Sequence, residues 1–552
     1  MMKKNIAMLL LIIFLGTFLR IYRVLDFPVQ LNHDEISQLY DAISVSQTAK
    51  DVYGNFLPTM FESVHDFKSP FYTYATVLFI YLLGDGEMTI KMPALLFGIL
   101  IIPAIFWFTT KLFNNLTISY ITAFITAISP FELFFSRKSF ENGAGIFFML
   151  IGFSALMTYL ERKNQLSWLY LGIIALAFGM YTYFSHAIII PLLILIFILI
   201  YRSKFLKISL KTYFVPVFIF ALLLIPLFLI ISLNPGSRYR SQTVFVSQDV
   251  TLGEKLGYID KDNSVASTLL YYKTNFDFIF NRYLEQFGPE YIFLNGLDFT
   301  NQGPVGMGPL FLLQFPFLIL GIIFLLKKGD LHKNLFILFW ILIGVLPSGL
   351  TFEAFSPHRI IMVFTMLNII SAVGFYWFMQ SLNRFRRLDT LMKRGVIGCL
   401  SILLLINIIY FIHMYFVNLP FEKSQHIHYP FKQVAQFAWS EYDNYQYIVF
   451  DPLYGQVAPV IGTAAHYYMA YYGKYSPVKF QNEYRIGEKE REVLFDKFSI
   501  RKLNWEADRN LKRTLVIASH WSLPEHILTS ANVIKTFYHY DGQPAFYAIK
   551  LE

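Results

Sequence analysis

Long apolar runs separated by short polar segments dominate the first 416 residues of the chain. A helix that crosses a bilayer needs about 20 mostly apolar residues. Eleven runs are candidates for crossings: 5–23, 90–109, 117–135, 143–160, 166–184, 187–202, 213–232, 309–326, 335–351, 359–379 and 395–416. A further apolar run, 70–84, is short for a crossing. The pattern therefore predicts an all-α polytopic membrane region.

The pattern changes after residue 417. The segments "YQYIVFD" and "RTLVIASHW" are typical of buried strands, and "KQVAQFAW" is typical of a helix. The segment "TFYHYDGQPAFYAIKLE" places Asp-Gly between two alternating runs, which indicates a β-hairpin. We therefore expect residues 1–416 to form a transmembrane domain and residues 417–552 to form a small α/β domain.

The composition supports an integral membrane protein. The 552 residues are 55% hydrophobic and only 15% charged, which excludes an ordinary soluble domain. A single cysteine, Cys399, excludes a disulfide within the chain and a metal site built from cysteines. The net charge of +9 does not indicate a nucleic-acid partner, because most of the excess lies beside apolar runs, where it reports topology.

Clusters of basic residues predict the orientation of the helices, because such clusters favour the cytoplasmic side. Three clusters follow apolar runs: Arg202, Lys204, Lys207 and Lys211; Lys327, Lys328 and Lys333; and Arg384, Arg386, Arg387, Lys393 and Arg394. With a cytoplasmic N-terminus, eleven crossings place all three inside, whereas a twelfth crossing at 70–84 would place all three outside. We therefore predict a half-inserted helix at 70–84, and extracytoplasmic segments at 24–89, 233–308 and 417–552.

Ionisable residues gather at the predicted outer ends of the helices. They include Asp34, Glu35, Asp66, Lys68, Arg137, Glu141, His186, His358 and Arg359. Charges near lipid are costly and usually functional, so their shared membrane depth predicts a site. Each also has a structural explanation. Asn32 and Glu35 resemble a helix capping box, Lys68 and Arg359 could anchor at the interface, and His186 could serve packing.

Several motifs occur in an order and spacing that resemble a known family. They are "HDE", "GNFLP…FKSPFYTY", "IKMPALLFGILIIPAIFWFTTKLF", "ISPFELFFSRKSFENG" and "SPHRIIMVFTMLNIISAVG". Together they resemble the C-type membrane glycosyltransferases, and most closely the branch of protein O-mannosyltransferases and lipid A aminoarabinose transferases. The resemblance covers residues 1–200 well, 300–380 loosely and the tail weakly.

The resemblance implies an enzyme that transfers a sugar, with inversion, from a polyprenyl-phosphate-linked donor to a lipid, glycan or protein acceptor at the outer membrane face. Asp34 matches the essential acidic residue of the first outer loop. Asp66 and Lys68 match an acid-Lys-Pro stretch, although Ser69 separates Lys68 from Pro70. Further matches link Glu141 to an acid in the second outer loop, His358-Arg359 to a phosphate-binding position, and His186 to a Lys or His of relatives.

The chemistry of this reaction agrees with the residues. Displacement at an anomeric carbon requires a base for the acceptor hydroxyl and stabilisation of the departing phosphate. The candidate catalytic residues are Asp34, Glu35 and Asp66; the candidate phosphate-binding residues are Lys68, Arg137, His358 and Arg359; and Glu141 and His186 are further site candidates. A divalent cation, Mg²⁺ or Mn²⁺, could be held by Asp34, Asp66 and Glu141, but the chemistry does not require it.

Two other classes of protein fit the composition. A transporter or lipid flippase without glycosyl transfer usually has polar sites at mid-membrane and repeated halves, and the sequence shows neither mid-span charges nor a convincing repeat. A non-catalytic scaffold that presents the tail would not need the acidic pair. The sequence leaves the sugar, the acceptor and the oligomeric state open.

Overall fold

The computed structural model divides the chain into two compact units. The described residues are 2–63, 66–162, 165–209, 211–233, 236, 242, 244–259, 264–298, 303–352, 355–384, 389–454, 460–461, 464–489, 492–529 and 532–551, without the side chains of residues 2–5, 63, 66, 460 and 461. The first unit comprises Met1–Tyr22 and Ala94–Met414, and the second comprises Arg23–Pro93 and Tyr415–Glu552. The predicted boundary at residue 416 lies at an edge of the second unit. This unit also contains residues 24–89, which are called the first outer segment after their predicted location.

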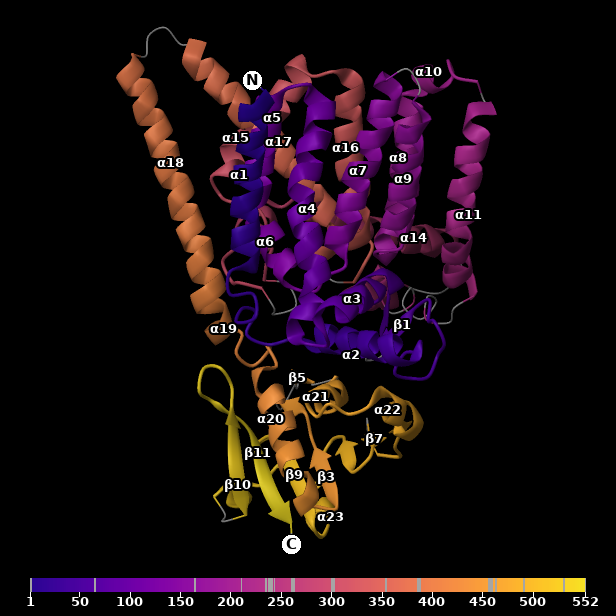
Figure 1. The fold of residues 1–552 in the computed structure, drawn as a ribbon, viewed down its shortest axis with the longest axis vertical. Helices are drawn as coiled ribbons and strands as arrows, with labels where there is room; N and C mark the ends of the chain where they lie inside the picture. The colour runs from indigo at the N-terminus through magenta and orange to yellow at the C-terminus, as the bar shows by residue number, and fades with distance from the viewer. Residues whose placement is uncertain are drawn as a thin grey trace. The chain divides into compact units, whose positions relative to one another are not determined.

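Every predicted apolar run contains a helix in the structure (Figure 1). The corresponding helices are α1 (Met2–Ile21), α4 (Glu87–Phe113), α5 (Leu116–Ile128) with α6 (Pro130–Arg137), α7 (Asn142–Glu161), α8 (Leu166–Met180), α9 (Phe184–Ile200), α11 (Lys211–Leu233), α15 (Gln314–Lys328), α16 (Leu331–Gly349), α17 (Ile361–Arg384) and α18 (Thr390–His413). Shorter elements between them are α10 (Arg202–Phe205), α13 (Val250–Gly257) and α14 (Val265–Glu285).

The polytopic helical architecture is confirmed, but the number of crossings stays a prediction. Among the described residues, six helices are long and apolar enough to cross a membrane, or seven if the bent pair α5–α6 counts as one span. Four shorter apolar helices lie at Ile6–Ile21, Pro70–Leu83, Leu166–Met180 and Phe184–Ile200. The cytoplasmic N-terminus and the extracytoplasmic tail also stay predictions.

The predicted run 117–135 is not one straight helix, because α5 and α6 meet at a bend of 51°. Pro130 has no amide hydrogen and disfavours the helical conformation at the preceding residue. Ser129 is accordingly extended, with φ −55° and ψ 130°. The bend leaves the last carbonyls of α5 without partners in their own helix. The side chain of Arg20 on α1 donates hydrogen bonds to two of them, as described below.

Aromatic side chains form much of the core of the first unit. Phe153 on α7 packs against Trp340 and Phe336 on α16 and against Phe197 on α9, with ring centroids 5.2–5.7 Å apart. The helices α7 and α8 approach closely at Gly152 and Gly172, where a Cβ atom on Gly152 would lie 2.5 Å from Leu176. Small residues permit such close packing of membrane helices. This packing fixes the helix ends that carry several candidate residues.

The tail in the second unit is the predicted α/β fold. Its seven-stranded sheet has the order β10-β11-β9-β3-β8-β7-β6, in which β3 pairs in parallel with both β8 and β9. The strands are β3 (Tyr447–Phe450), β6 (Arg485–Ile486), β7 (Val493–Phe495), β8 (Phe498–Ile500), β9 (Thr514–Ala518), β10 (Val533–Tyr538) and β11 (Pro544–Leu551), and a separate pair is β4 (Leu453–Tyr454) with β5 (Val460–Ile461).

The helices of the tail are α19 (Leu419–Glu422), α20 (Tyr429–Ser440), α21 (Ala465–Tyr472), α22 (Pro477–Glu483), α23 (Trp505–Asp508) and α24 (Glu525–Leu528). The predicted hairpin is confirmed as β10–β11, with Gly542 at φ +84° in its turn. The residues predicted as strands and helix correspond to β3, β9 and α20. The α/β class of the tail is therefore confirmed.

The first outer segment folds against this tail within the second unit. It contains α2 (His33–Thr48), a short hairpin of β1 (Phe61–Ser63) and β2 (Asp66–Lys68), and α3 (Pro70–Leu83). The helix α2 packs on α3, α21 and α22. The amide of Gln481 donates to Ser44, Thr48 and the carbonyl of Asp51 at 2.8–3.0 Å. The acidic motif at the start of α2 therefore belongs to the same packed body as the tail.

One face of α3 is buried and the opposite face is apolar and exposed. Tyr72 and Thr76 are buried, whereas Leu78 and Leu82 are 65% and 75% exposed. Such a helix suits the boundary of a membrane, where one face contacts lipid. The half-inserted position of residues 70–84 remains a prediction that this exposure supports.

Candidate active site

The N-terminus of α2 carries the acidic motif in two different environments. Asn32 and Glu35 form a capping box: the Asn32 side chain accepts from the Glu35 amide, and the Glu35 carboxylate accepts from the Asn32 amide, each at 2.9 Å. Glu35 also pairs with Lys91 at 3.3 Å, and both side chains are only 2% exposed. Its two carboxylate contacts start the helix and neutralise a buried cation. The geometry thus gives Glu35 a structural role.

Asp34, in contrast, presents its carboxylate to the surroundings. Its side chain is 45% exposed, whereas the side chain of its partner Lys68 is only 8% exposed. The Lys68 ammonium lies 2.9 Å from Oδ1 of Asp34, and Nε2 of His33 lies 3.6 Å from Oδ2. A carboxylate that is fixed on one side and exposed on the other can accept a proton from an incoming group.

The ammonium of Lys68 is engaged in hydrogen bonds at the start of α2. It has three N–H donors, and three acceptors lie within reach: Oδ1 of Asp34 at 2.9 Å, the carbonyl of Asp34 at 3.0 Å and the hydroxyl of Ser37 at 2.9 Å. The hairpin β1–β2 delivers Lys68 to this position. These contacts favour a role in positioning Asp34 over the predicted role in binding the donor phosphate.

The structure describes the backbone of Asp66 but not its side chain. Its backbone pairs with Ser63 in the β1–β2 hairpin, but its side chain lies outside the described residues, as does the whole of His65. The predicted catalytic and metal-binding roles of Asp66 therefore remain predictions.

Arg137, at the end of α6, caps the C-terminus of α1. Its Nη1 donates to the carbonyls of Leu19, Arg20 and Tyr22 at 3.1, 2.9 and 2.7 Å. The carbonyls of Leu19 and Arg20 belong to the last turn of α1 and that of Tyr22 directly follows it, at the negative end of the helix dipole, where a cation is stabilising. The residue is 1% exposed. The contacts favour a structural role over the predicted phosphate binding.

Arg20 makes the complementary contact. This arginine of α1 is fully buried and donates to the carbonyls of Ala127 at 3.0 Å and Thr126 at 3.3 Å. Both carbonyls lie at the end of α5, next to the bend before Pro130. The helix α1 thus caps α5 through Arg20, and α6 caps α1 through Arg137.

His358 and Arg359 lie in a short 3₁₀ turn, Pro357–Arg359, and α17 begins only at Ile361. Arg359 is therefore just before the helix rather than its first residue, and it is 8% exposed. The carbonyl of His358 accepts from Nδ2 of Asn142 at 2.5 Å. The ring of Phe140 stacks on the imidazole, with centroids 5.9 Å apart. The turn is consequently held by Phe140, between α6 and α7, and by Asn142 at the start of α7.

Glu141 and His186 lie close to this turn in the packing of the first unit. Glu141 directly precedes α7 and is 7% exposed, next to Asn142. His186, in α9, is fully buried, and its Nδ1 lies 2.9 Å from the hydroxyl of Thr182. The ring of Tyr183 lies 5.8 Å from the His186 ring and 6.4 Å from the His358 ring. The structure thus brings both His186 and His358 next to the ring of one tyrosine, Tyr183.

A glycine on α7 makes room for His186. A Cβ atom on Gly145 would lie 2.2 Å from two atoms of the imidazole. Real Cβ atoms do not approach other atoms so closely, so any larger residue would displace the ring. His186 is thereby confined to its contact with Thr182.

Metal binding by the candidate acids is not favoured by the described contacts. No group of three or more His, Cys, Asp or Glu that could hold a metal occurs among the residues that the structure describes. Lys68 already places a positive charge 2.9 Å from the Asp34 carboxylate, which opposes a second cation there. The divalent cation at Asp34, Asp66 and Glu141 remains a prediction, and no step below depends on it.

The tail contributes side chains next to the acidic motif that sequence reasoning missed. His428 packs edge-on against His33, with ring centroids 5.5 Å apart. The hydroxyl of Tyr468 donates to the carbonyl of Leu31 at 2.5 Å. Lys91, Ser37 and Tyr183 were missed as well. Ser37, one turn after Asp34, and Tyr183, three residues before His186, had local signals, whereas the contacts of His428, Tyr468 and Lys91 join distant parts of the chain.

Asp41 is a third acid on α2, and the sequence analysis did not single it out. It is 1% exposed, and its Oδ1 accepts from the amide of Val52 at 3.3 Å. Burial, reinforced by the negative charge of Asp51, raises the pKa of Asp41 well above its usual value. Burial thus favours the neutral form of Asp41.

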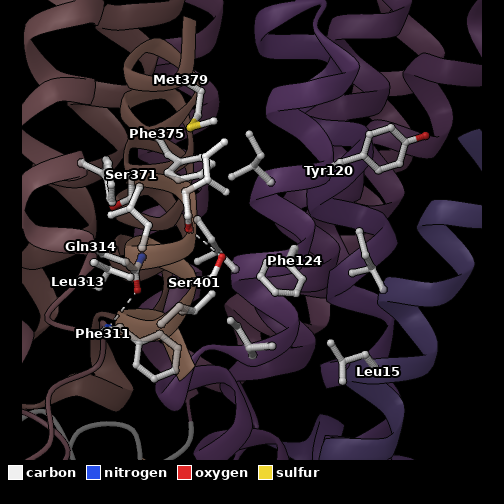
Figure 2. Close-up of a pocket in the computed structure, with 18 of the residues that line it drawn as sticks. Leu15, Tyr120, Phe124, Phe311, Leu313, Gln314, Ser371, Phe375, Met379 and Ser401 are labelled. Carbon is white, nitrogen blue, oxygen red and sulfur yellow. Dashed lines mark hydrogen bonds between the residues drawn. The ribbon is translucent and has the colours of Figure 1, made fainter. Parts of the chain in front are cut away.

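The first unit also contains an apolar pocket with a volume of about 440 Å³, lined by residues of α1, α5, α15, α17 and α18 and of the segment before α15 (Figure 2). Leu15, Phe124 and Phe375 are among the hydrocarbon side chains that line it. The polar Gln314 is satisfied, since it accepts from the Phe311 amide at 3.0 Å and donates to Asn368 at 2.9 Å. The pocket therefore suits a hydrocarbon chain.

Comparisons with known proteins agree with these features. Residues 67–230 match the family of dolichyl-phosphate-mannose-protein mannosyltransferases. The structure resembles ArnT from Cupriavidus metallidurans bound to undecaprenyl phosphate, with a TM-score of 0.51, 11% identity, and coverage of 99% of this chain and 97% of ArnT. No curated protein sequence matches the chain.

A second structural relative is the oligosaccharyltransferase AglB from Archaeoglobus fulgidus, in complex with an inhibitory peptide and a dolichol-phosphate. The TM-score is 0.50, the identity is 13%, and the similarity covers 85% of this chain. The chain spans only 63% of the length of AglB. The family match over residues 67–230 and the shared fold agree with the resemblance seen in the sequence: this part of the chain is similar to the protein mannosyltransferases, and the polytopic fold is similar to that of ArnT.

Proposed function

We propose that this protein transfers a sugar from a polyprenyl-phosphate-linked donor to an acceptor at the extracytoplasmic membrane face, with Asp34 as the general base. The observation that carries the proposal is the exposed Asp34 carboxylate, fixed by the buried ammonium of Lys68 at 2.9 Å. The family match, and the polyprenyl and dolichol phosphates bound by ArnT and AglB, support the lipid-linked donor.

In the proposed reaction, Asp34 accepts the proton of the acceptor hydroxyl. The acceptor oxygen forms a bond with the anomeric carbon while the bond from that carbon to the phosphate oxygen breaks, and the phosphate keeps the electron pair. A single displacement of this kind inverts the anomeric centre. Lys68 and Ser37 orient the base, so that its exposed oxygen faces the acceptor.

We assign the departing phosphate to His358 and Arg359. A guanidinium offers forked donors that match phosphate oxygens, and a buried one interacts more strongly than one in water. The contacts of Asn142 and Phe140 fix the turn that carries both residues. Glu141 and His186 are assigned supporting positions around this turn. Lys68 and Arg137 are less suitable, because their described contacts engage helix ends.

The apolar pocket of the first unit supports a donor with a long hydrocarbon tail. A chain of isoprene units would gain free energy by leaving water for such surroundings. The sugar, whether hexose or pentose, and the acceptor are not specified by these residues. A transporter or flippase has no comparable support, since it requires neither an exposed, oriented carboxylate nor a leaving-group site.

The test is sugar release from labelled polyprenyl-phosphate donors by the full-length protein in lipid nanodiscs. Asp34→Asn should lower the rate by about 10²–10⁴-fold, the usual contribution of a general base. Its thermal unfolding should match that of the wild type. The matched control is Asp26→Asn, which removes another exposed carboxylate, 55% exposed and paired with Arg23. Full activity in Asp34→Asn would exclude Asp34 as the base. Movement of intact donor across the bilayer without cleavage would instead indicate a flippase.

A further inference from the structure

A second cavity, with a volume of about 580 Å³, lies within the second unit. One wall comes from the first outer segment, through Tyr40, Ile43 and Gln47 on α2 and residues 85–87 at the start of α4. The other comes from the tail, through α20, the end of α21 and the turn before α22. Tyr40, Ile43 and Gln47 recur at helical spacing, so they share one face of α2. Two distant parts of the chain therefore build this cavity together.

Four tyrosines line the cavity, and their hydroxyls are all engaged. Tyr40 donates to the carbonyl of Tyr475 at 2.9 Å, Tyr471 to the carbonyl of Asp85 at 2.9 Å, Tyr472 to the Glu87 carboxylate at 3.1 Å, and Tyr475 to the Glu483 carboxylate. These bonds fix the orientation of the rings. Tyr40 and Tyr475 are buried, at 2% and 8% exposure, so Tyr471 and Tyr472 are the rings that offer partly exposed surfaces to a ligand, at a small entropy cost for ordering them.

The charges of the cavity are balanced, and its other polar groups suit a ligand rich in hydroxyls. Glu87 pairs with Lys432 at 2.6 Å, so neither a strongly anionic nor a strongly cationic ligand is favoured. Gln47 and Gln436 are exposed along the walls. A carboxamide both donates and accepts hydrogen bonds, as the hydroxyls of a sugar do. Rigid aromatic faces with amides beside them match the C–H faces and hydroxyls of pyranose rings.

We propose that this cavity binds a neutral oligosaccharide that forms part of the acceptor. The acceptor role rests on the proposed function, whereas carbohydrate binding rests on the cavity itself. Tyr40 follows Asp34 by six residues on the same helix, which corresponds to about 9 Å along its axis. At about 100° per residue, Asp34 also lies about 120° around α2 from Tyr40, so a glycan of a few rings held in the cavity would reach the base by passing around the helix as well as along it. The acceptor class becomes a glycan or a glycan-bearing molecule.

The test is the binding of fluorescently labelled neutral oligosaccharides, two to four hexoses long, to the full-length protein in nanodiscs, measured by thermophoresis. Gln436→Trp places a large side chain in the cavity and should weaken binding about tenfold or more. Gln47→Ala removes an exposed amide with little risk to folding and should weaken binding by about threefold. Lys479→Trp, an exposed position of α22 outside the cavity, should bind as the wild type does.

Unchanged binding in both Gln436→Trp and Gln47→Ala would overturn the proposal, as would a wild type that binds none of these oligosaccharides. Preference for a neutral peptide of similar length over every oligosaccharide would overturn it too. The failure of the proposed function would look different. A wild type that binds oligosaccharides, with the expected losses in both variants, but cleaves no lipid-linked donor would support the carbohydrate site while refuting the transferase assignment.

Discussion

Two helix ends in this molecule use charged side chains in opposite ways. At the C-terminus of α1, Arg137 is 1% exposed and its Nη1 donates to three backbone carbonyls. At the N-terminus of α2, the cation Lys68 is likewise buried, but its partner Asp34 remains 45% exposed. Both places contain charges that the sequence marks as unusual near lipid. The presence of charge therefore does not distinguish the two places. The exposure of the Asp34 carboxylate marks it as the candidate for chemistry, whereas the buried Arg137 is a structural cap.

The largest expected effect distinguishes the neighbours Asp34 and Glu35. Glu35→Gln should lower the free energy of unfolding by about 3–5 kcal/mol, because it leaves the buried Lys91 without its carboxylate. Asp34→Asn should change this free energy little, since its carboxylate is half exposed. Denaturant unfolding in detergent would measure both. The double variant Glu35→Gln/Lys91→Met should recover part of the stability, and the absence of any recovery would argue against the ion pair as the cause.

The second effect concerns the cap of α1. Arg137→Gln should destabilise the protein by about 2–3 kcal/mol, the scale for losing hydrogen bonds from a charged group to buried acceptors. Thermal unfolding provides the measurement, with the exposed Arg162→Gln as the control. If Arg137 serves the donor phosphate instead, stability should stay unchanged while the Michaelis constant for the donor rises.

The third effect tests the phosphate site. Arg359→Lys keeps the positive charge but loses the forked donors, so use of the donor should weaken by about 1–3 kcal/mol. The apparent affinity for the acceptor should change less. Steady-state kinetics with each substrate varied in turn would separate the two, and Arg394→Lys, at an exposed position, is the control. Unchanged donor kinetics would mean that Arg359 is only an anchor at the interface.

The smallest effect is a dependence of stability on pH that arises from Asp41. Its pKa is raised well above the usual value by burial, with Asp51 adding to the shift. Between the ordinary pKa, about 4, and the raised one, the folded state holds a proton that the unfolded state has lost. Stability should therefore fall as the pH rises through this window, by at most about 1.4 kcal/mol per pH unit from this one group.

Unfolding measured across this pH range would show the slope, and Asp41→Asn should flatten it. The exposed Asp26→Asn should leave the slope as in the wild type. An identical slope in Asp41→Asn and the wild type would mean that other groups cause it.

Much of the fold could be predicted from local patterns. Every apolar run contains a helix, the Asp-Gly pair marks the hairpin β10–β11, and Asn32 and Glu35 form the predicted capping box. These features depend on neighbouring residues alone. The same local reasoning placed Arg137 at the phosphate, because nothing near it in the sequence shows that its acceptors lie 115–118 residues earlier.

The candidate site was predictable in its residue types but not in its division of roles. The Asp34–Lys68 contact joins a helix to a strand 34 residues later, and only the folded hairpin shows that the three donors of Lys68 are already engaged. The contacts of His428 and Tyr468 with the acidic motif span about 400 residues and leave no sequence pattern. The sequence shows Pro130, but it did not predict that the run 117–135 would bend there.

The shared unit of the first outer segment and the tail has a consequence for biosynthesis. The residues around Asp34 leave the ribosome early, whereas Tyr468 and Gln481, which pack against the same segment, are made more than 400 residues later. The helices between these two parts of the chain are therefore synthesised before the residues that complete the surroundings of the acidic motif. A chain that stops after α18 would contain Asp34, the proposed base, without the tail residues that pack against its segment, so the surroundings of the acidic motif are complete only when the tail has been made.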